Sequence, residues 1–176
     1  MTLYNRFSLS PDFMTNTPNI NLKKKVMLEE FIKLIKKAEI LDEDPKFYGS
    51  NSEENISRVE NALKIKFDDF LKAYLLEYGG GGIPDLLHTN GILPENPLSD
   101  NQYTFYGATV YARQEFQLPD HFLVINSNFP SDVLVLDSHS GTIYNYEMYS
   151  QNRSSTLYPN FENYLLTEWE ALIEEY

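Results

Sequence analysis

The chain has no cysteine, which excludes disulfide bonds and any site that depends on a thiolate ligand or a redox-active thiol. It also has no run of about 18 apolar residues, so we expect no segment to span a membrane. Its first residues, MTLYNRFSLSPDFMTNTPN, lack the basic stretch followed by an apolar one that marks a secretory signal. We therefore expect a cytoplasmic protein with no membrane partner.

Basic residues are scarce in the C-terminal part of the chain. Residues 73–176 contain only Arg113 and Arg153 against 14 acidic residues, whereas 12 basic and 12 acidic residues cancel in residues 1–72. The net charge of −12 therefore falls on the C-terminal part. A surface of this sign repels a phosphate backbone and attracts a basic protein, so we expect a protein partner and no nucleic acid. The alternative is that the charge serves only solubility.

Apolar residues make up 42 % of the chain and aromatic residues 14 %, which is enough to bury the core of one domain. We expect this single domain to occupy residues 20–176. Residues 1–19 are polar and contain Pro11 and Pro18, so we expect them to form an irregular N-terminal arm.

The hydrophobic pattern predicts helices first, then strands, then a closing helix. Apolar residues at helical spacing predict helices over residues 21–40, 51–63, 67–78 and 160–176. Strands are predicted over 102–107, 121–126, 132–137 and 142–149, with a short helix over 108–116. This order predicts an α+β fold, in which helices pack mainly on one side of an antiparallel sheet.

The predicted helix ends carry the expected polar residues and glycines. Helix starts are predicted at Asn51 with Glu54 as a capping box, at Asp68 or Asp69, and at Asn160. Four of the eight glycines, residues 79–82, follow the third helix. A phosphate loop needs its glycines before a helix, whereas here the carbonyl end of a helix faces them and repels anions. We therefore predict that the run ends the helix and turns the chain toward a strand.

No pattern of catalytic or metal-binding residues emerges. The histidines His88, His121 and His139 do not pair with one another or with carboxylates at the spacing of metal ligands. The segment DSHS, residues 137–140, has hydrolase residue types, but neighbours in one turn cannot converge on a common proton as a triad must. We therefore expect no enzyme activity, no metal ion and no cofactor. A buried acid or histidine in a deep pocket would reopen the enzyme hypothesis.

Tyrosines on the last predicted strand favour an interface. Tyr144 and Tyr146 point to one face of this strand, and Glu147 and Tyr149 point to the other. One set must pack on the helices, and exposed tyrosines among carboxylates in the other would suit a protein partner. The alternative is that both faces are covered.

Several segments together resemble a known family. In ISRVENALKIKFDDFLKAYLLEYGGGG, residues 56–82, a helix with Ile and Glu leads through Leu to an aromatic-rich helix that ends in Tyr-Gly-Gly. The segments that follow in order are LPDHFLVI (118–125), DVLVLD (132–137), GTIYNY (141–146) and NFENYL (160–165). From about residue 50 onward the chain resembles the SUKH superfamily of the Smi/Knr type. Phe67-Asp68 replaces the usual Leu-Pro and Asn160 replaces the usual Ser, and both replacements still begin a helix well.

The resemblance implies an α+β fold and a protein-binding role without catalytic residues. Many bacterial members are immunity proteins that neutralise a toxin, often a nuclease, while fungal members are regulatory scaffolds. We therefore predict an immunity protein that binds a cognate toxin and blocks its active site or substrate groove. From charge placement and the family's habit, the predicted contacts are Asp85, Asp100, Glu115, Asp132, Asp137, Tyr144, Tyr146 and Glu147. The alternative is a regulatory scaffold without a toxin partner.

Overall fold

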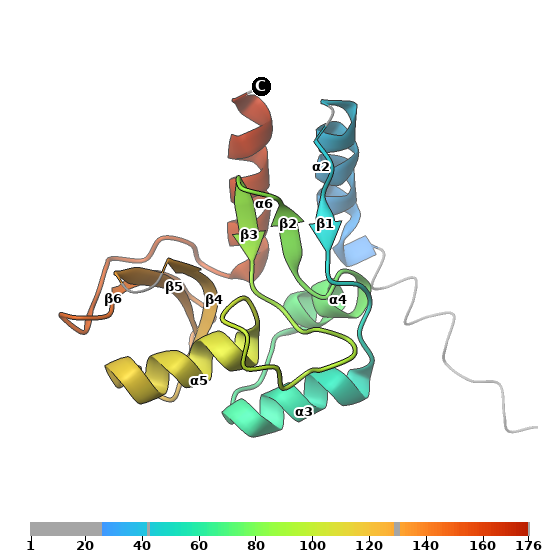
Figure 1. Cartoon of the computed structure of the whole chain (residues 1–176). Helices are drawn as coiled ribbons and strands as arrows, with labels where there is room; N and C mark the ends of the chain where they lie inside the picture. The colour runs from blue at the N-terminus through green and yellow to red at the C-terminus, as the bar shows by residue number, and fades with distance from the viewer. Residues whose placement is uncertain (1–25, 42, 129–130, 176) are drawn as a thin grey trace, which may run out of the picture.

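The computed structural model describes residues 26–41, 43–128 and 131–175, so the predicted arm at 1–19 lies outside the described residues. Within them the chain forms five helices and seven strands, arranged as two antiparallel sheets (Figure 1). The helices are α2 (Glu29–Ile40), α3 (Glu53–Leu63), α4 (Asp69–Glu77), α5 (Phe105–Phe116) and α6 (Phe161–Glu174). The strands are β1 (Lys46–Phe47), β2 (Gly81–Ile83), β3 (Leu87–Thr89), β4 (Phe122–Asn128), β5 (Asp132–Asp137), β6 (Ile143–Glu147) and β7 (Asn152–Arg153). The predicted α+β class is confirmed.

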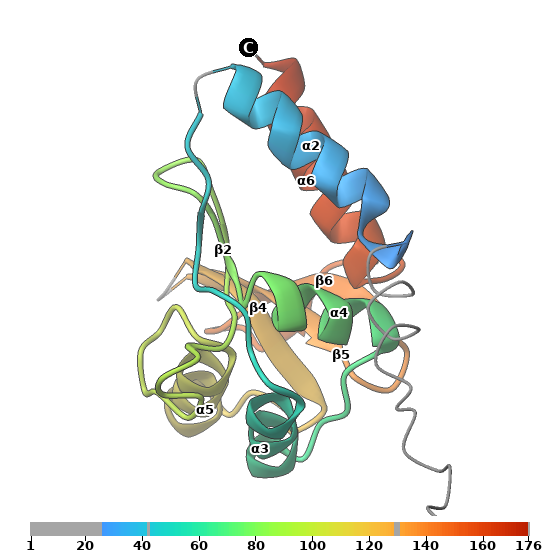
Figure 2. The ribbon, with the colours of Figure 1, turned by 90° about the vertical axis from the view of Figure 1, so that its right-hand side faces the viewer.

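The smaller sheet, β1-β2-β3, is covered on one face by α2 and α6, which lie side by side (Figures 1 and 2). Phe47 of β1 stacks on Trp169 of α6 with 6.0 Å between ring centroids, and Phe31 of α2 meets the same indole edge-on at 5.0 Å. Because side chains alternate along a strand, Lys46 and Tyr48 point away from these helices. In the described part of the chain, no helix covers the opposite face of this sheet (Figure 2).

The larger sheet is a meander, β4-β5-β6-β7, with α5 packed against β4. A register shift between Val124 and Asn126 bends β4 at the point where Thr109 of α5 reaches it. There the Thr109 hydroxyl accepts a hydrogen bond from the Val124 N–H at 3.0 Å. This contact satisfies a buried donor that the irregular strand would otherwise leave unpaired.

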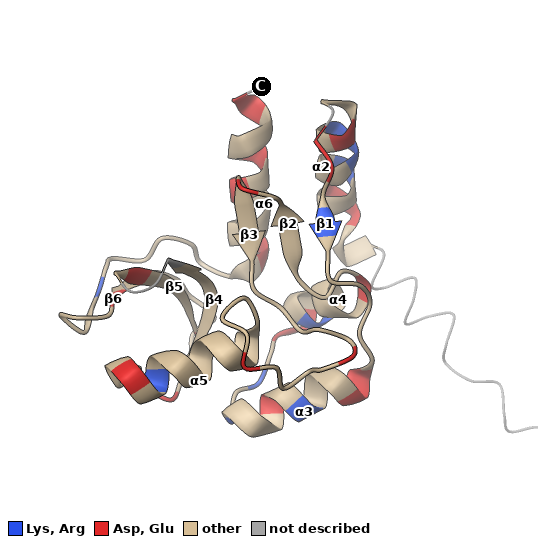
Figure 3. Ribbon diagram, viewed as in Figure 1, with Lys and Arg blue, Asp and Glu red and all other residues tan. Residues whose placement is uncertain are grey.

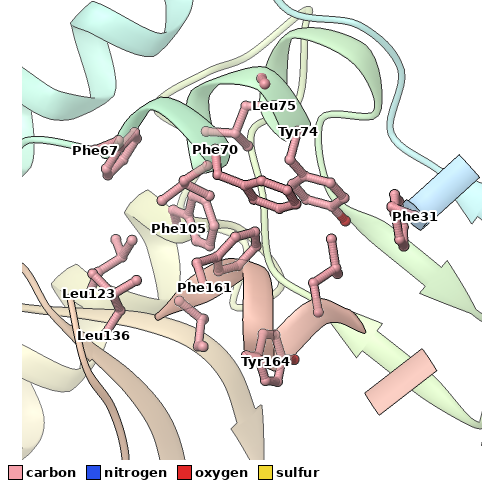
Figure 4. Close-up of a cluster of buried hydrophobic side chains, with 14 of the residues drawn as sticks. Phe31, Phe67, Phe70, Tyr74, Leu75, Phe105, Leu123, Leu136, Phe161 and Tyr164 are labelled. Atoms are coloured by element: carbon pink, nitrogen blue, oxygen red, sulfur yellow. The ribbon is translucent and has the colours of Figure 1, made fainter. Parts of the chain in front are cut away.

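The two sheets meet at Asn90, directly after β3. Its backbone N–H donates to the Ile125 carbonyl at 2.8 Å, and its side-chain amide donates to the Val124 carbonyl at 3.3 Å. The main hydrophobic core runs through this junction, with contributions from every helix and from both sheets (Figure 4). The fully buried rings at its centre include Phe31, Tyr74, Phe105, Phe161, Tyr164 and Trp169.

The glycine run ends α4, as predicted, and also allows two stretches of backbone to cross. Gly79 follows the last turn of α4 with a φ of +75°, a left-handed conformation that glycine adopts without strain. The Gly79 carbonyl accepts the Ile92 N–H at 2.6 Å. A Cβ atom on Gly91 would lie 1.9 Å from this Gly79 oxygen, so no side chain fits at the crossing.

Two local predictions are wrong. Residues 102–107, predicted as a strand, form a turn and then the first residues of α5, because the Thr104 hydroxyl accepts the Gly107 N–H at 3.0 Å and caps the helix. The start of α3 is capped by Ser52, whereas Asn51 is buried and donates to the Ile92 carbonyl at 2.8 Å. The caps predicted at Asp68 and Asn160 are confirmed.

Candidate partner-binding surfaces

Two predicted acidic residues, Asp132 and Glu147, lie directly opposite each other on neighbouring strands β5 and β6. Opposite residues of an antiparallel pair share one face of the sheet, with Cβ atoms about 4.5–5.5 Å apart. Together with Ser131, Tyr149 and Ser150 they line a hollow of about 400 Å³. We call Asp132, Glu147 and Tyr149 the hairpin surface.

The contacts of these two carboxylates are with neutral groups. Asp132 accepts hydrogen bonds from the Asn145 amide at 3.2 Å and from the Ser131 hydroxyl at 2.6 Å. Glu147 accepts one from the Ser150 hydroxyl at 2.7 Å. Among the residues that the structure describes, no lysine or arginine lies within ion-pair distance of either carboxylate. Like charges directly opposite on a sheet destabilise it, so this pair would be relieved by a cation from outside the chain.

Both arginines of the C-terminal part are engaged elsewhere. Arg113 donates to the Leu63 carbonyl at 3.0 Å, and its Nε lies 3.8 Å from the Asp120 carboxylate. Arg153 lies over the ring of Tyr144, with 4.8 Å from its guanidinium carbon to the ring centroid. Neither arginine therefore neutralises the negative charge at the hairpin surface.

The last turn of α5 contacts the turn that follows β6, and Figure 3 shows acidic residues at this end of α5 and on the neighbouring strands. The predicted contact Glu115 belongs to α5, which packs on the face of the larger sheet opposite to Asp132 and Glu147. Phe116 meets Tyr149 edge-on with 5.7 Å between ring centroids, and the Gln151 amide donates to the Phe116 carbonyl at 3.4 Å. Tyr149 is 75 % exposed. Sequence reasoning did not include Tyr149 among the contacts, although its alternation with Glu147 placed both on one face.

A second hollow lies on the open face of the β1-β2-β3 sheet and contains the predicted residue Asp85. It has a volume of about 590 Å³, and an adjoining hollow of about 320 Å³ shares the walls Tyr48, His88 and Tyr103. Gly81 and Gly82 of β2 line the larger one. We call this pair of hollows the aromatic groove.

Hydrogen bonds hold the aromatic walls in one arrangement. The Tyr48 hydroxyl donates to the Tyr103 carbonyl at 2.9 Å and lies 3.1 Å from Nε2 of His88. Because the hydroxyl has a single proton, Nε2 of His88 is the donor in the second contact. Burial lowers the pKa of the His88 imidazole and raises that of the Tyr48 phenol, so both groups are neutral at neutral pH.

Within residues 26–41, 43–128 and 131–175, no group of three or more His, Asp or Glu side chains is placed to hold a metal ion. His121 and His139 stack on each other with 5.0 Å between ring centroids.

No helix in the described part of the chain has the length and apolar character needed to cross a membrane.

The comparison with known families agrees with the α+β fold described above. Residues 28–170 match the family model SUKH_5, described as SMI1-KNR4 cell-wall. The chain belongs to the SUKH family. A search of curated proteins finds no match. Membership indicates an immunity-type or SMI1/KNR4-like protein. Of the residues that carried the resemblance, Ile56, Glu60, Tyr74 and Gly79 lie in or beside α3 and α4.

The remaining predicted contact residues of this SUKH protein lie apart from the hairpin surface. Tyr146 is 4 % exposed and packs in the cluster between α5 and the larger sheet, while Tyr144 is half-buried beside it. Asp137 is 8 % exposed and accepts the His139 N–H at 2.9 Å in the β5–β6 turn. Asp100 is exposed and precedes Asn101, which lines the aromatic groove. Of the predicted acidic contacts, the structure thus brings together Asp132 and Glu147, whereas Asp85 lies in the aromatic groove and Glu115, Asp100 and Asp137 lie in neither hollow.

Proposed function

We propose that this chain is an immunity protein that neutralises a cognate toxin, with the hairpin surface as its main contact. The supporting observation is the pair of opposed carboxylates, Asp132 and Glu147, which lie beside an exposed tyrosine and have no lysine or arginine of the described residues within ion-pair distance. Such a pair costs stability in the free protein and is compensated when a basic side chain of a partner enters the hollow. Tyr149 adds a rigid apolar ring with a hydrogen-bonding tip, as interfaces favour.

A basic toxin domain, such as a nuclease that itself binds an anionic substrate, fits this surface best. Its substrate-binding lysines and arginines would face the carboxylates, and the immunity protein would occupy the space of the substrate. Opposite charges also speed the encounter of the two proteins at low salt. The alternative function is a regulatory scaffold for another protein, which the family's description as SMI1-KNR4 cell-wall supports.

The test is co-expression with the C-terminal toxin domain encoded beside this gene, scored by cell survival and co-purification. We expect survival and a 1:1 complex whose Kd rises with salt concentration. Reversing both charges with Asp132→Lys and Glu147→Lys should weaken binding at least about tenfold, since one buried charge contact is worth about 2–5 kcal/mol. The matched control is Glu170→Lys with Glu174→Lys, two exposed acids on α6 that give the same change in net charge.

Two results would count against the proposal. Equal affinity of the charge-reversed hairpin variant and the α6 control would remove the hairpin surface as the contact. Cell death without complex formation would remove that toxin as the partner and favour the scaffold alternative. Circular dichroism and a thermal melt of each variant establish that the binding data come from folded protein.

A further inference from the structure

The aromatic groove is a second candidate binding surface, and the charge pattern of the sequence alone did not reveal it. Its walls come from three distant parts of the chain: Tyr48 after β1, His88 in β3, and Tyr103 before α5. His88 and Tyr103 meet edge-on with 5.2 Å between ring centroids, and the rings of Tyr48 and His88 are 5.9 Å apart. These rings stand between the two hollows, because all three residues line both.

The groove presents an accessible aromatic face. Tyr103 is 59 % exposed, although its backbone is held by the Asn101 side chain, which accepts the Tyr103 N–H at 2.8 Å, and by the Tyr48 hydroxyl. Beside it, Gly81 and Gly82 carry no side chain that could fill the hollow. A preformed ring next to open space can receive a flat group without a rearrangement of the chain.

The charge around the groove is negative. Asp85 lines its larger hollow, and Asp100 precedes Asn101 in the smaller one. In the described part of the chain, neither carboxylate has a lysine or arginine within ion-pair distance. Lys46, which also lines the groove, is paired with Asp44. The groove therefore complements a cation and repels phosphate groups.

We propose that the aromatic groove binds an arginine side chain on an extended segment of the protein partner. A guanidinium is planar and weakly hydrated, so it stacks on a tyrosine ring and keeps its N–H groups free for carboxylates. Tyr103 supplies the ring, while Asp85 supplies the compensating charge. The inference rests on the proposed function only for the identity of the partner, which would be the toxin.

The binding test uses a defined peptide and the full chain. The probe is acetyl-Gly-Arg-Gly-Arg-Gly-amide, followed by amide chemical-shift changes in ¹⁵N NMR at low salt. We expect saturable shifts around Tyr48, His88 and Tyr103. The same peptide with citrulline in place of arginine keeps the shape but loses the charge, and it should leave these signals unmoved.

Two pairs of variants separate the groove from the hairpin surface. Tyr103→Ala should weaken peptide binding about fivefold or more, as expected for loss of a stacked cation, whereas Tyr149→Ala removes an exposed tyrosine of the hairpin surface and should not. Asp85→Asn should weaken binding, while Asp132→Asn should leave the groove signals unchanged. Asparagine suits the φ of +64° at residue 85, so this variant is expected to fold.

The proposal is overturned if the shifts map to the hairpin surface, if Tyr103→Ala and Tyr149→Ala weaken binding equally, or if citrulline binds as well as arginine. Absence of saturable shifts in the groove overturns it too. These failures leave the charge-reversal test at Asp132 and Glu147 intact, because that test measures toxin binding by a different surface. Conversely, if the chain does not bind a toxin, the result of the peptide experiment is unaffected.

Discussion

The carboxylate of Glu60 joins the end of α3 to the start of α4, and its removal should cost a measurable share of stability. Glu60 is 3 % exposed and accepts the Phe67 N–H at 2.8 Å. Lys66 and Lys72 approach the same carboxylate at 3.1 Å and 3.2 Å. Burial by itself would raise the pKa of Glu60, but the Phe67 N–H and the two lysines outweigh it, so this pKa lies below its usual value.

The expected magnitude follows from what each partner loses in Glu60→Ala. The buried Phe67 N–H would be left without an acceptor, which costs about 1–3 kcal/mol. Lys66 is 75 % exposed, so its ion pair adds little, and Lys72, at 32 % exposed, adds up to about 1 kcal/mol. We expect a loss of about 2–4 kcal/mol for Glu60→Ala. Glu60→Gln keeps an acceptor for Phe67 and should lose about 1 kcal/mol.

Urea unfolding at several pH values tests both the size and the cause of this effect. Because the folded-state pKa of Glu60 lies below the unfolded value of 4.5, its contribution is present above pH 4.5 and is lost as the pH falls through the folded-state pKa. The gap between wild type and Glu60→Gln should therefore be full at pH 7 and shrink as the pH falls below 4.5 through the folded-state pKa. A Glu60→Ala loss below about 1 kcal/mol, or a pH-independent gap to Glu60→Gln, would refute the reasoning.

Two further predictions concern the backbone crossing and the hairpin surface. Gly91→Ala should destabilise the protein by more than about 3 kcal/mol in urea unfolding, because its methyl group would overlap the Gly79 carbonyl. The control Gly141→Ala, with open space around its Cβ but a φ of +77°, should cost only about 1 kcal/mol. Asp132→Asn with Glu147→Gln should stabilise the free protein by about 0.5 kcal/mol at low salt, and this gain should vanish at 0.5 M salt if like-charge repulsion is its cause.

Elements with a strong local signal were predicted well from the sequence. The helices α4 and α6 combine a helical repeat of apolar residues with a side-chain cap, Asp68 and Asn160, that lies next to the helix it starts. The strands β4, β5 and β6 were found within two residues of their ends. Local hydrogen bonds and periodicity act within a few residues, so they can be read along the chain.

The prediction for residues 102–107 failed because it used the local sequence pattern alone. The segment QYTFYG was predicted as a strand, but the Thr104 hydroxyl lies within hydrogen-bond distance of the Ser99 and Asn101 carbonyls and so holds a helix start. The three-stranded sheet was missed for a related reason. Its strands are two or three residues long, too short for any period to show, and they pair only because the core holds them together.

The sequence by itself determined the α+β class, the family, the acidic C-terminal part and the starts of α4 and α6. Only the tertiary structure decided which face of β6 is buried. Tyr146 is buried because its face packs against α5, whereas Glu147, on the other face, is exposed. It also decided which acids stand together, and in the aromatic groove it joined Tyr48 to Tyr103, 55 positions away in the sequence. Contacts over such separations depend on how the elements pack, and the local signals that shape each element do not specify that packing.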